Sequence, residues 1–284
     1  MRRTDDDIVV VSNRNSFCDI EFVGVYKPLI EKGKDRLNRF KLVESQIGGP
    51  ESRMKLREYS PHSRNFRRRI WYTSENLRPP VHEGLDALLS FDQDEFLGTN
   101  LYCPSWYSEI AHSENILSMN LLGKQTAQNL LLPRKFIEAQ PSFCSADATH
   151  LNSFHFHTIS RLKELGRLDL LTKGISSVGT SNDKISGKYR FILCSENDIY
   201  PGYVTNVLIK AYLAGGIPLY LGDLGKDPHI NRNSFINILD FPTLREFISY
   251  LQKLDVESYR LIYEQPFLNS LPDIGKIRNF ILGD

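Results

Sequence analysis

A strand, a loop, a helix and a second strand are predicted in direct succession between residues 189 and 222, and this order restricts the possible folds more than any other feature. Residues 189–194 carry mainly aromatic and aliphatic side chains without a glycine or proline, which predicts a short buried strand. Apolar side chains recur at helical spacing over 207–214, and Gly215 ends this pattern. Residues 217–221 predict the second strand. A right-handed crossover of this kind places the two strands in parallel.

Polar side chains follow the first of these strands immediately. Residues 195–198 are Ser, Glu, Asn and Asp, and Pro201 and Gly202 then predict a turn. Thr205 is the expected N-cap of the following helix. Ligands of parallel sheets bind beyond the carboxyl ends of the strands, and the N–H groups of a first helical turn favour phosphate. The pattern therefore favours a nucleotide diphosphate at this loop, and a plain connection between strand and helix is the alternative.

Three blocks of the chain, including this one, resemble the alpha-1,3-fucosyltransferase family, which is glycosyltransferase family ten. The run Ser-Glu-Asn-Asp-Ile-Tyr-Pro-Gly-Tyr-Val-Thr at 195–205, followed by Ile-Pro-Leu-Tyr-Leu-Gly at 217–222, is similar to the donor-binding signature of that family. Residues 231–242 resemble its next block, and residues 70–80 with 86–92 resemble its acceptor-domain motif. The blocks keep the order and spacing of the family, which chance similarity rarely preserves.

The resemblance implies an α/β fold of the GT-B type, with two facing Rossmann-like domains that contain parallel sheets. A chain of 284 residues is long enough for two domains of ordinary size. We expect residues 1–135 to form an N-terminal acceptor-binding domain and residues 136–265 to form a C-terminal nucleotide-sugar-binding domain. Residues 266–284 are expected to form a C-terminal helix that returns to the first domain.

Apolar spacing predicts helices in two further segments. An amphipathic helix is expected over residues 160–170, and a second helix over residues 244–254. Residues 175–184 are expected to form a loop before the central strand.

The resemblance also implies an activity, that of a glycosyltransferase that moves one sugar from a nucleotide sugar to a glycan acceptor and inverts the anomeric carbon. Glu75, at the carboxyl end of the strand predicted over 69–73, matches the family glutamate that takes the proton from the acceptor hydroxyl. A second carboxyl is not needed, because the departing diphosphate requires no proton at pH 7. We therefore expect no metal and no cofactor besides the sugar-nucleotide substrate. Without the resemblance, Glu75 is better explained as a loop residue that caps a turn.

The candidate binding residues form a donor group and an acceptor group. His155 joins the donor group because it lies near the position of a family arginine. Trp106 is a candidate stacking surface for an acceptor sugar, although large aromatic side chains are often simply buried. The donor group is Ser195, Glu196, Asn197, Tyr203, Thr205, Asn206 and His155, and the acceptor group is Asn13, Arg78 and Trp106.

The donor motif departs from the family pattern at charged positions. The family has Thr-Glu-Lys where residues 205–207 are Thr, Asn and Val, and no arginine occurs between Cys144 and Arg161. Loss of one phosphate-facing cation removes a charge-assisted hydrogen bond worth about 1.5–3 kcal/mol. The donor is therefore open between GDP-fucose and another sugar nucleotide such as UDP-xylose. A catalytically inactive carbohydrate-binding protein on the same scaffold is a second alternative.

A metal remains an alternative at the triplet Asp92-Gln93-Asp94, because glycosyltransferases of another fold hold a divalent cation through such a pattern. The same triplet lies in the acceptor-domain block of a family that we expect to be metal-independent. Addition of a chelator distinguishes the two interpretations.

Charge and cysteine content restrict the partners and the location. The 35 Lys and Arg residues nearly balance the 34 Asp and Glu residues, for a formal net charge of +1, so we expect no nucleic-acid partner. The apolar run at 8–11 is too short for a signal peptide, and no stretch reaches the roughly 20 apolar residues of a membrane span. The four cysteines are scattered without a CxxC pair, which favours free thiols and a cytoplasmic protein.

Overall fold

The chain folds into two units, which we describe separately. The computed structural model describes residues 10–13, 20–23, 40–43, 68–72, 76, 85–107, 127–136, 142–147, 153–171 and 187–283. The first unit contains Met1–Ser105 and Asp273–Asp284, and the second contains Trp106–Pro272. The domain boundaries that we expect after residues 135 and 265 stay predictions.

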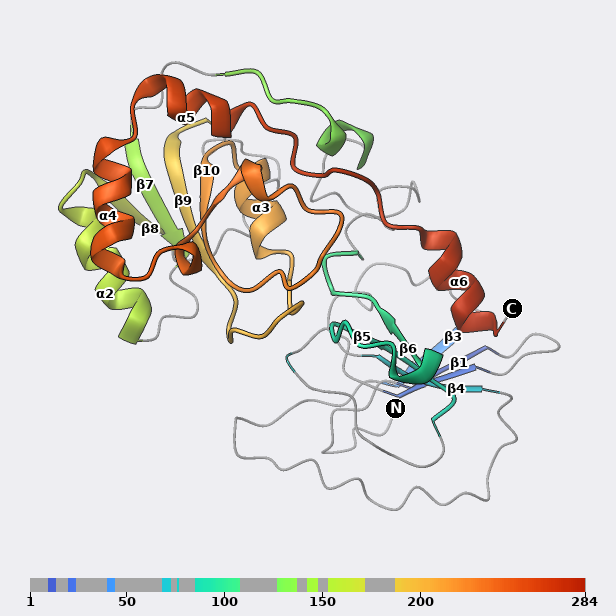
Figure 1. Ribbon diagram of the computed structural model, residues 1–284. Coiled ribbons are helices and arrows are strands. Elements are labelled where there is room, and N and C mark those ends of the chain that lie inside the picture. The colour runs from blue at the N-terminus through green and yellow to red at the C-terminus, as the bar shows by residue number, and fades with distance from the viewer. Residues whose placement is uncertain are drawn as a thin grey trace. The chain divides into compact units, whose positions relative to one another are not determined.

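The described part of the first unit contains a parallel sheet (Figure 1). Its elements are β1 (Val10–Asn13), β2 (Ile20–Val23), β3 (Phe40–Val43), β4 (Arg68–Tyr72), β5 (Ala87–Ser90), the 3-10 turn η1 (Phe96–Gly98), β6 (Asn100–Tyr102) and helix α6 (Ile274–Leu282). The sheet has the strand order β2-β4-β5-β6, and each neighbouring pair is parallel. Strands β1 and β3 pair separately in antiparallel direction. Ile70, Ala87 and Leu89 are buried, as is typical of strands inside a parallel sheet.

The described part of the second unit is built on a five-stranded parallel sheet. Its strands are β7 (Ser142–Asp147), β8 (Leu168–Leu171), β9 (Tyr189–Ser195), β10 (Ile217–Leu221) and β11 (Ile236–Asn237). The order is β11-β10-β9-β7-β8, so β9 lies at the centre. Strands β9 and β10 are neighbours, and helix α3 (Val207–Leu213) connects them. The predicted strand–helix–strand unit is therefore confirmed.

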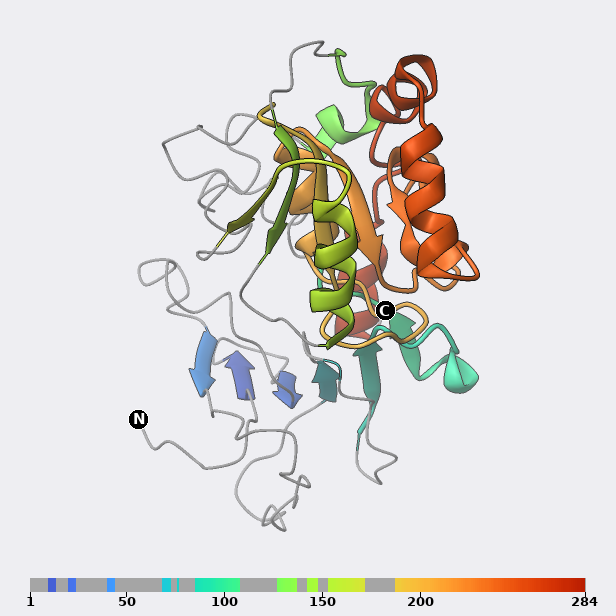
Figure 2. The ribbon, with the colours of Figure 1, turned by 90° about the vertical axis from the view of Figure 1, so that its left-hand side faces the viewer.

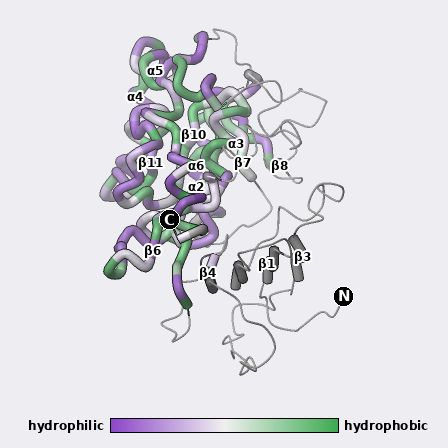
Figure 3. Tube along the Cα trace, turned by 90° about the vertical axis from the view of Figure 1, so that its right-hand side faces the viewer, coloured by the Kyte–Doolittle hydropathy of each residue, from purple (hydrophilic) through white to green (hydrophobic). Residues whose placement is uncertain are grey.

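Helices cover both faces of this second sheet. They are α2 (Ser153–Lys163), α3, α4 (Leu244–Lys253) and α5 (Val256–Tyr263), with the 3-10 turns η2 (Ala127–Leu131), η4 (Arg232–Ser234) and η5 (Ile238–Asp240). Side chains of α2, α4 and α5 share one core with β9 and β10, and Figure 2 looks onto this face. Helix α3 packs against β9 and β10 from the other face. Hydrophobic and hydrophilic residues alternate along α4 and α5, as expected of helices that cover a sheet with one side (Figure 3).

Two local predictions need correction, and one is confirmed. The helix expected over residues 160–170 ends at Lys163, and strand β8 occupies the last part of that segment. The turn between them contains Gly166, where a Cβ atom would lie 2.7 Å from the Cβ atom of Phe143, so the chain passes too close for a side chain. Helix α3 has Asn206 rather than Thr205 at its N-cap. The helix expected over 244–254 is confirmed as α4.

Within the residues that the structure describes, no helix combines the length and the apolar character needed to cross a membrane.

Candidate functional site

The carboxyl end of the central strand β9 carries a buried acidic side chain, Glu196. The strand ends at Ser195, and the backbone N–H of Glu196 still donates to the carbonyl oxygen of Leu221 on β10, at 3.0 Å. Glu196 is only 3% exposed, although it follows the strand at an edge where polar loops begin. Burial of a carboxyl is costly unless it is hydrogen-bonded, so Glu196 needs partners within the protein.

One oxygen of this carboxyl accepts two hydrogen bonds. Oε1 of Glu196 accepts from the backbone N–H of Thr205 at 3.0 Å and from the phenol of Tyr220 at 2.9 Å. Its second oxygen, Oε2, has no hydrogen-bond partner among the described residues. Burial raises the pKa of Glu196 to about 7, although the bonds from Thr205 and Tyr220 favour the ionised form.

The glycine after β10 makes this arrangement possible. A Cβ atom at Gly222 would collide with the phenol oxygen of Tyr220 and would lie 2.9 Å from Cγ of Glu196. The Tyr220 side chain is fully buried, and its hydroxyl group folds back over the glycine to reach the carboxyl group. The Ile-Pro-Leu-Tyr-Leu-Gly run therefore shapes the carboxyl edge of the sheet with two residues, Tyr220 and Gly222, that the sequence alone did not single out.

The loop between β9 and α3 is held in place at several points. Gly202 has a positive φ of 86° and donates its N–H to the carbonyl of Asp223 at 2.9 Å. Such a φ favours glycine, because a side chain would be strained there. The backbone N–H of Tyr203 donates to Tyr200 at 3.0 Å, and Tyr203 and Val204 are buried. The loop is therefore preformed and packed onto the sheet.

The predicted donor residues in this stretch do not all have the same surroundings. Glu196 and Thr205 are in direct contact, and Thr205 Oγ1 accepts from the N–H of Val207 at 3.4 Å. Asn197 is exposed and Ser195 is half-buried, whereas the ring of Tyr203 is buried. Asn206 is half-buried at the start of α3, and its carbonyl accepts from the N–H of Lys210 at 3.0 Å. These residues, Ser195, Glu196, Asn197, Tyr203, Thr205 and Asn206, lie at one edge of one sheet.

His155 lies on a different element, in the first turn of α2. The side chain is buried, and burial lowers its pKa below the usual value of 6.5. A histidine with such a pKa is neutral at pH 7, so His155 does not supply the positive charge of the family arginine near whose position it falls.

The side chains of the predicted catalytic residue and of two predicted acceptor residues lie outside the part of the chain that the structure describes. Glu75 and Arg78 lie outside the described residues. Asn13 is the last residue of β1, and its side chain also lies outside the description. Their assignments stay predictions.

Trp106, the third predicted acceptor residue, is 1% exposed and belongs to a buried aromatic cluster. Its ring nitrogen donates to Oδ2 of Asp227 at 3.1 Å, and it packs edge-on against Tyr107 with ring centres 4.7 Å apart. Oδ1 of Asp227 accepts from the backbone N–H groups of His229 and Ile230 at 2.9 and 3.1 Å. The stacking face that we expected for a sugar is covered, because the indole ring holds residue 106 against the loop after β10.

Arg134 is a second buried group that the sequence did not single out. Its guanidinium carbon lies 3.9 Å from the ring centre of Tyr212 and 4.2 Å from that of Tyr263. The group donates to the carbonyls of Tyr212, Gly216 and Tyr263 at 2.9, 3.1 and 3.0 Å. These carbonyls lie at the carboxyl ends of α3 and α5, where a cation is favoured by the helix dipole. Arg134 therefore fixes α3 from the end opposite to the candidate site.

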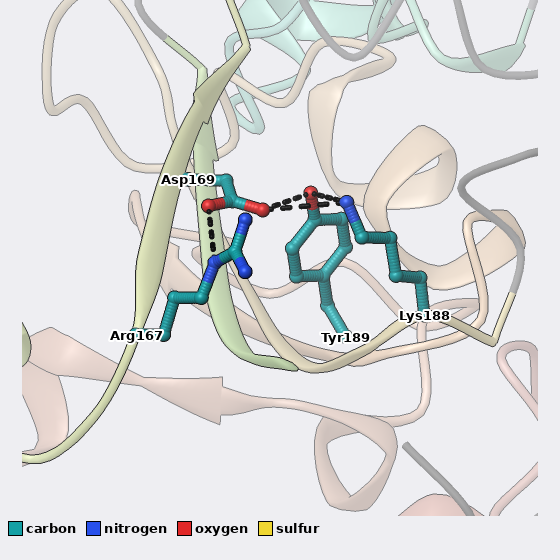
Figure 4. Close-up of polar contacts among 4 residues, drawn as sticks. All are labelled: Arg167, Asp169, Lys188 and Tyr189. Atoms are coloured by element: carbon teal, nitrogen blue, oxygen red, sulfur yellow. Dashed lines mark hydrogen bonds and ion pairs between the residues drawn. The ribbon is translucent and has the colours of Figure 1, made fainter. Parts of the chain in front are cut away.

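The amino ends of the same strands carry a different polar cluster (Figure 4). Asp169 on β8 accepts from the phenol of Tyr189 on β9 at 2.9 Å and from the ammonium group of Lys188 at 3.3 Å. Its other oxygen accepts from Nε of Arg167 at 3.0 Å. The hydrogen bond from Arg167, followed by that from Tyr189, holds the pKa of Asp169 below its usual value. This cluster therefore lies at the end of the sheet opposite to the candidate site.

A metal site is not apparent in the described part of the chain, where no group of three or more His, Cys, Asp or Glu side chains is arranged to hold an ion. At the predicted triplet, Oδ1 of Asp92 accepts from the backbone N–H of Asp94 at 3.4 Å, a contact within the loop itself. Metal binding at Asp92-Gln93-Asp94 is therefore an alternative that the chelator experiment tests.

Comparison with known proteins agrees with the resemblance seen in the sequence. Residues 146–264 match the model of the C-terminal part of glycosyltransferase family 10 (fucosyltransferase). The alpha-(1,3)-fucosyltransferase FucT of Helicobacter pylori is 26% identical over 238 residues, which are 72% of this chain and 48% of that protein. A putative fucosyltransferase of Acanthamoeba polyphaga mimivirus is 28% identical over 127 residues, 40% of this chain and 21% of that protein. The chain thus spans about half or less of the length of these relatives.

Solved structures support the fold. A crystal structure of an alpha1,3-fucosyltransferase is similar with a TM-score of 0.57 and 24% identity, over 76% of this chain and 74% of that one. A second structure, of an alpha1,3-fucosyltransferase with GDP-fucose, has the same TM-score and 23% identity, over 76% of this chain and 75% of that one. The predicted resemblance to family ten and the predicted α/β fold of the GT-B class are confirmed.

Proposed function

We propose that this chain, which has the fucosyltransferase-like scaffold of glycosyltransferase family 10, transfers one sugar from a nucleotide sugar to a glycan acceptor. The observation that carries the proposal is the preformed loop at 196–206, at the carboxyl end of the central strand of a parallel sheet. Sheets of this kind bind nucleotides at that edge. The segment that matches the family model, residues 146–264, includes the whole loop.

The donor is a sugar linked to a nucleoside diphosphate, and GDP-fucose is the first candidate. An alpha1,3-fucosyltransferase of similar fold has been solved with GDP-fucose, which supports this choice by analogy. Residues 195–207 contain no lysine or arginine, so a diphosphate would be held there by hydrogen-bond donors rather than by charge. A different donor, such as UDP-xylose, is therefore the alternative within the same enzyme class.

The proposed chemistry is a direct displacement with inversion at the anomeric carbon. Glu75 takes the proton of the acceptor hydroxyl as that oxygen attacks, and the nucleoside diphosphate leaves from the opposite side of the sugar. This assignment rests on the match of Glu75 to the family motif. We propose that no metal and no cofactor takes part, and that the acceptor is a glycan.

A carbohydrate-binding protein without catalytic activity is the second candidate function. The absence of the family's Glu-Lys pair at positions 206 and 207 favours it, because these residues are Asn and Val here. It predicts glycan binding without sugar transfer.

Thermal unfolding with a panel of nucleotides tests the proposal first. A ligand that binds the native state raises the melting temperature. We expect a rise with GDP or with UDP, unchanged by EDTA, and the nucleotide that gives it identifies the donor class. A rise that EDTA abolishes would point to a metal, and no rise with GDP, UDP, CMP or dTDP would favour the binding-protein function.

The Glu75→Gln variant then separates catalysis from binding. Loss of a positioned general base costs on the order of 10²–10⁴ in rate. We expect sugar transfer to fall by this factor while the melting-temperature rise with the nucleotide stays the same. Equal transfer rates in both proteins would remove Glu75 from the mechanism.

A further inference from the structure

Glu196 joins three segments of the second unit through one oxygen atom. The residue itself follows β9, its Oε1 accepts from the N–H of Thr205 in the loop before α3, and the same atom accepts from the hydroxyl of Tyr220 on β10. Both donors are neutral groups. The bond to Thr205 joins the two ends of the loop between positions 196 and 205.

This connection is shielded from water. Glu196 is 3% exposed, and Tyr220 is 0% exposed. Tyr203 and Val204, which precede Thr205, are also buried. A hydrogen bond in such surroundings is stronger than one at the surface, and the loss of one partner leaves a buried group unsatisfied. The position of the Thr205 backbone therefore depends on the Glu196 carboxyl.

The same burial argues against direct contact between Glu196 and a ligand. Oε1 is occupied by its two donors, and Oε2 has almost no accessible surface although it has no partner among the described residues. A nucleotide would have to displace part of the loop to reach either atom. The half-buried Asn206, which directly follows Thr205 and begins α3, is the more accessible group.

We propose that Glu196 is a positioning residue for the sugar-nucleotide donor, which holds Thr205 and Asn206 in the binding conformation without contacting the donor itself. The proposal rests on the proposed function and deepens it. It also revises the sequence-based assignment of Glu196 as a donor-contacting residue. Glu196 acts through the Thr205 N–H, and Tyr220 acts by fixing the carboxyl.

The first arm of the test needs no ligand. Amide hydrogen exchange at Thr205 is compared in the unmodified protein and in the Glu196→Leu variant, which approximately keeps the volume of the side chain and removes both acceptor atoms. We expect exchange at Thr205 to accelerate by about tenfold or more, the size expected for one buried hydrogen bond. In Glu196→Gln, whose amide oxygen still accepts, most of the protection should return. Unchanged exchange at Thr205 in Glu196→Leu overturns the proposal.

The second arm measures the affinity for GDP and UDP by calorimetry in the same proteins. We expect the dissociation constant of the bound nucleotide to rise about tenfold in Glu196→Leu and to be largely restored in Glu196→Gln. Glu196→Asp replaces the leucine variant if that protein does not fold, since its shorter side chain cannot reach both donors. Faster exchange at Thr205 with an unchanged dissociation constant overturns the role in donor binding.

Tyr189→Phe is the matched control. It removes a tyrosine hydroxyl that donates to a carboxylate at 2.9 Å in the same sheet, as Tyr220 does, but at the amino ends of the strands. We expect neither Thr205 exchange nor nucleotide affinity to change. An effect equal to that of Glu196→Leu would mean that any loosening of the sheet alters the site, which overturns a specific role for Glu196. Absence of nucleotide binding by the unmodified protein overturns the proposed function, and the positioning role for the donor with it.

Discussion

Two tyrosine–carboxylate pairs occur at opposite ends of one parallel sheet, and their surroundings differ sharply. At the carboxyl ends, Tyr220 donates to Glu196 at 2.9 Å, with burial on all sides and a backbone N–H as the other donor. At the amino ends, Tyr189 donates to Asp169 at the same distance, but an arginine and a lysine complete the cluster (Figure 4).

The surroundings shift the pKa values of the two carboxyl groups in opposite directions. Burial raises the pKa of Glu196 to about 7, whereas the hydrogen bond from Arg167 lowers the pKa of Asp169. At the amino ends the tyrosine is also buried, but the carboxyl of Asp169 is partly exposed and is paired with the cations of Arg167 and Lys188. The carboxyl-end pair keeps a buried acidic group without a cation partner among the described residues, an arrangement that costs stability and is typical of functional sites. The comparison supports the carboxyl edge as the proposed donor site.

The largest expected effect is a dependence of stability on pH that Glu196 causes. Below pH 4.5 the carboxyl is protonated in both states, and between pH 4.5 and about 7 only the unfolded chain loses the proton. The free energy of unfolding therefore falls across this interval, by up to about 3 kcal/mol, and is constant above it. Urea unfolding at pH 5 and pH 8 measures this decrease. We expect it in the unmodified protein and not in Glu196→Gln.

Asp169→Asn is the control at the amino ends. Because the pKa of Asp169 lies below its usual value of 3.8, its contribution is present above that pH and is lost only as the pH falls further. The difference in stability between this variant and the unmodified protein should thus be the same at pH 5 and pH 8. A difference that changes between the two pH values would contradict the contrast between the two ends.

A glycine substitution at each end gives the next largest effect. Gly222→Ala forces the Tyr220 hydroxyl away from Glu196, and Gly166→Ala places a Cβ atom 2.7 Å from Phe143. Overpacking of this kind costs about 1–3 kcal/mol, so both variants should unfold at lower urea concentration. Only Gly222→Ala should also weaken nucleotide binding in calorimetry. Equal loss of binding in both would show that the carboxyl edge is not special.

The tyrosine pair gives a smaller effect. Tyr220→Phe removes a fully buried donor and should lower the free energy of unfolding by about 1–2 kcal/mol. Tyr189→Phe leaves Asp169 with two cationic donors and should cost less than about 1 kcal/mol. Chemical unfolding of both variants at pH 7 measures the difference, and a larger cost for Tyr189→Phe would reverse our ranking.

The smallest effect is expected at the exposed ion pair of the amino-end cluster. Arg167 donates to Asp169 at 3.0 Å from a largely exposed side chain. Surface pairs of this kind contribute less than about 1 kcal/mol, and salt screens them. Arg167→Ala should therefore shift the urea midpoint only slightly at low salt and not at all in 1 M NaCl. A large shift that persists at high salt would show that the cluster supports the fold.

The sequence predicted the central part of this fold because local patterns and chain order agree there. The strand at β9, helix α3 and strand β10 follow from apolar runs separated by glycine, proline and polar residues. The expected helix over 160–170 was wrong in its second half, because the apolar spacing of residues 168–171 fits a strand as well as a helix. Short apolar segments of this kind are decided by tertiary contacts.

The location of the candidate site stays a prediction, and its internal contacts became visible only in the structure. Glu196 and Thr205 were assigned together because they belong to one motif, and the structure joins them by a hydrogen bond. Tyr220 and Arg134 were not singled out, because an ordinary-looking tyrosine in a strand and an arginine after a proline give no sequence signal of their contacts. Trp106 was assigned to a sugar, and the structure covers its ring with Tyr107 and Asp227.

The sequence by itself determined the class of fold, the order of elements around the central strand and the resemblance to fucosyltransferases, since all three depend on residue type and spacing along the chain. Only the tertiary structure decided which carboxyl is buried, which of its oxygens is occupied and at which edge of the sheet the described residues supply no countercharge. Those properties depend on residues far apart in sequence, such as Glu196 and Tyr220, whose contact requires two parallel strands to lie side by side.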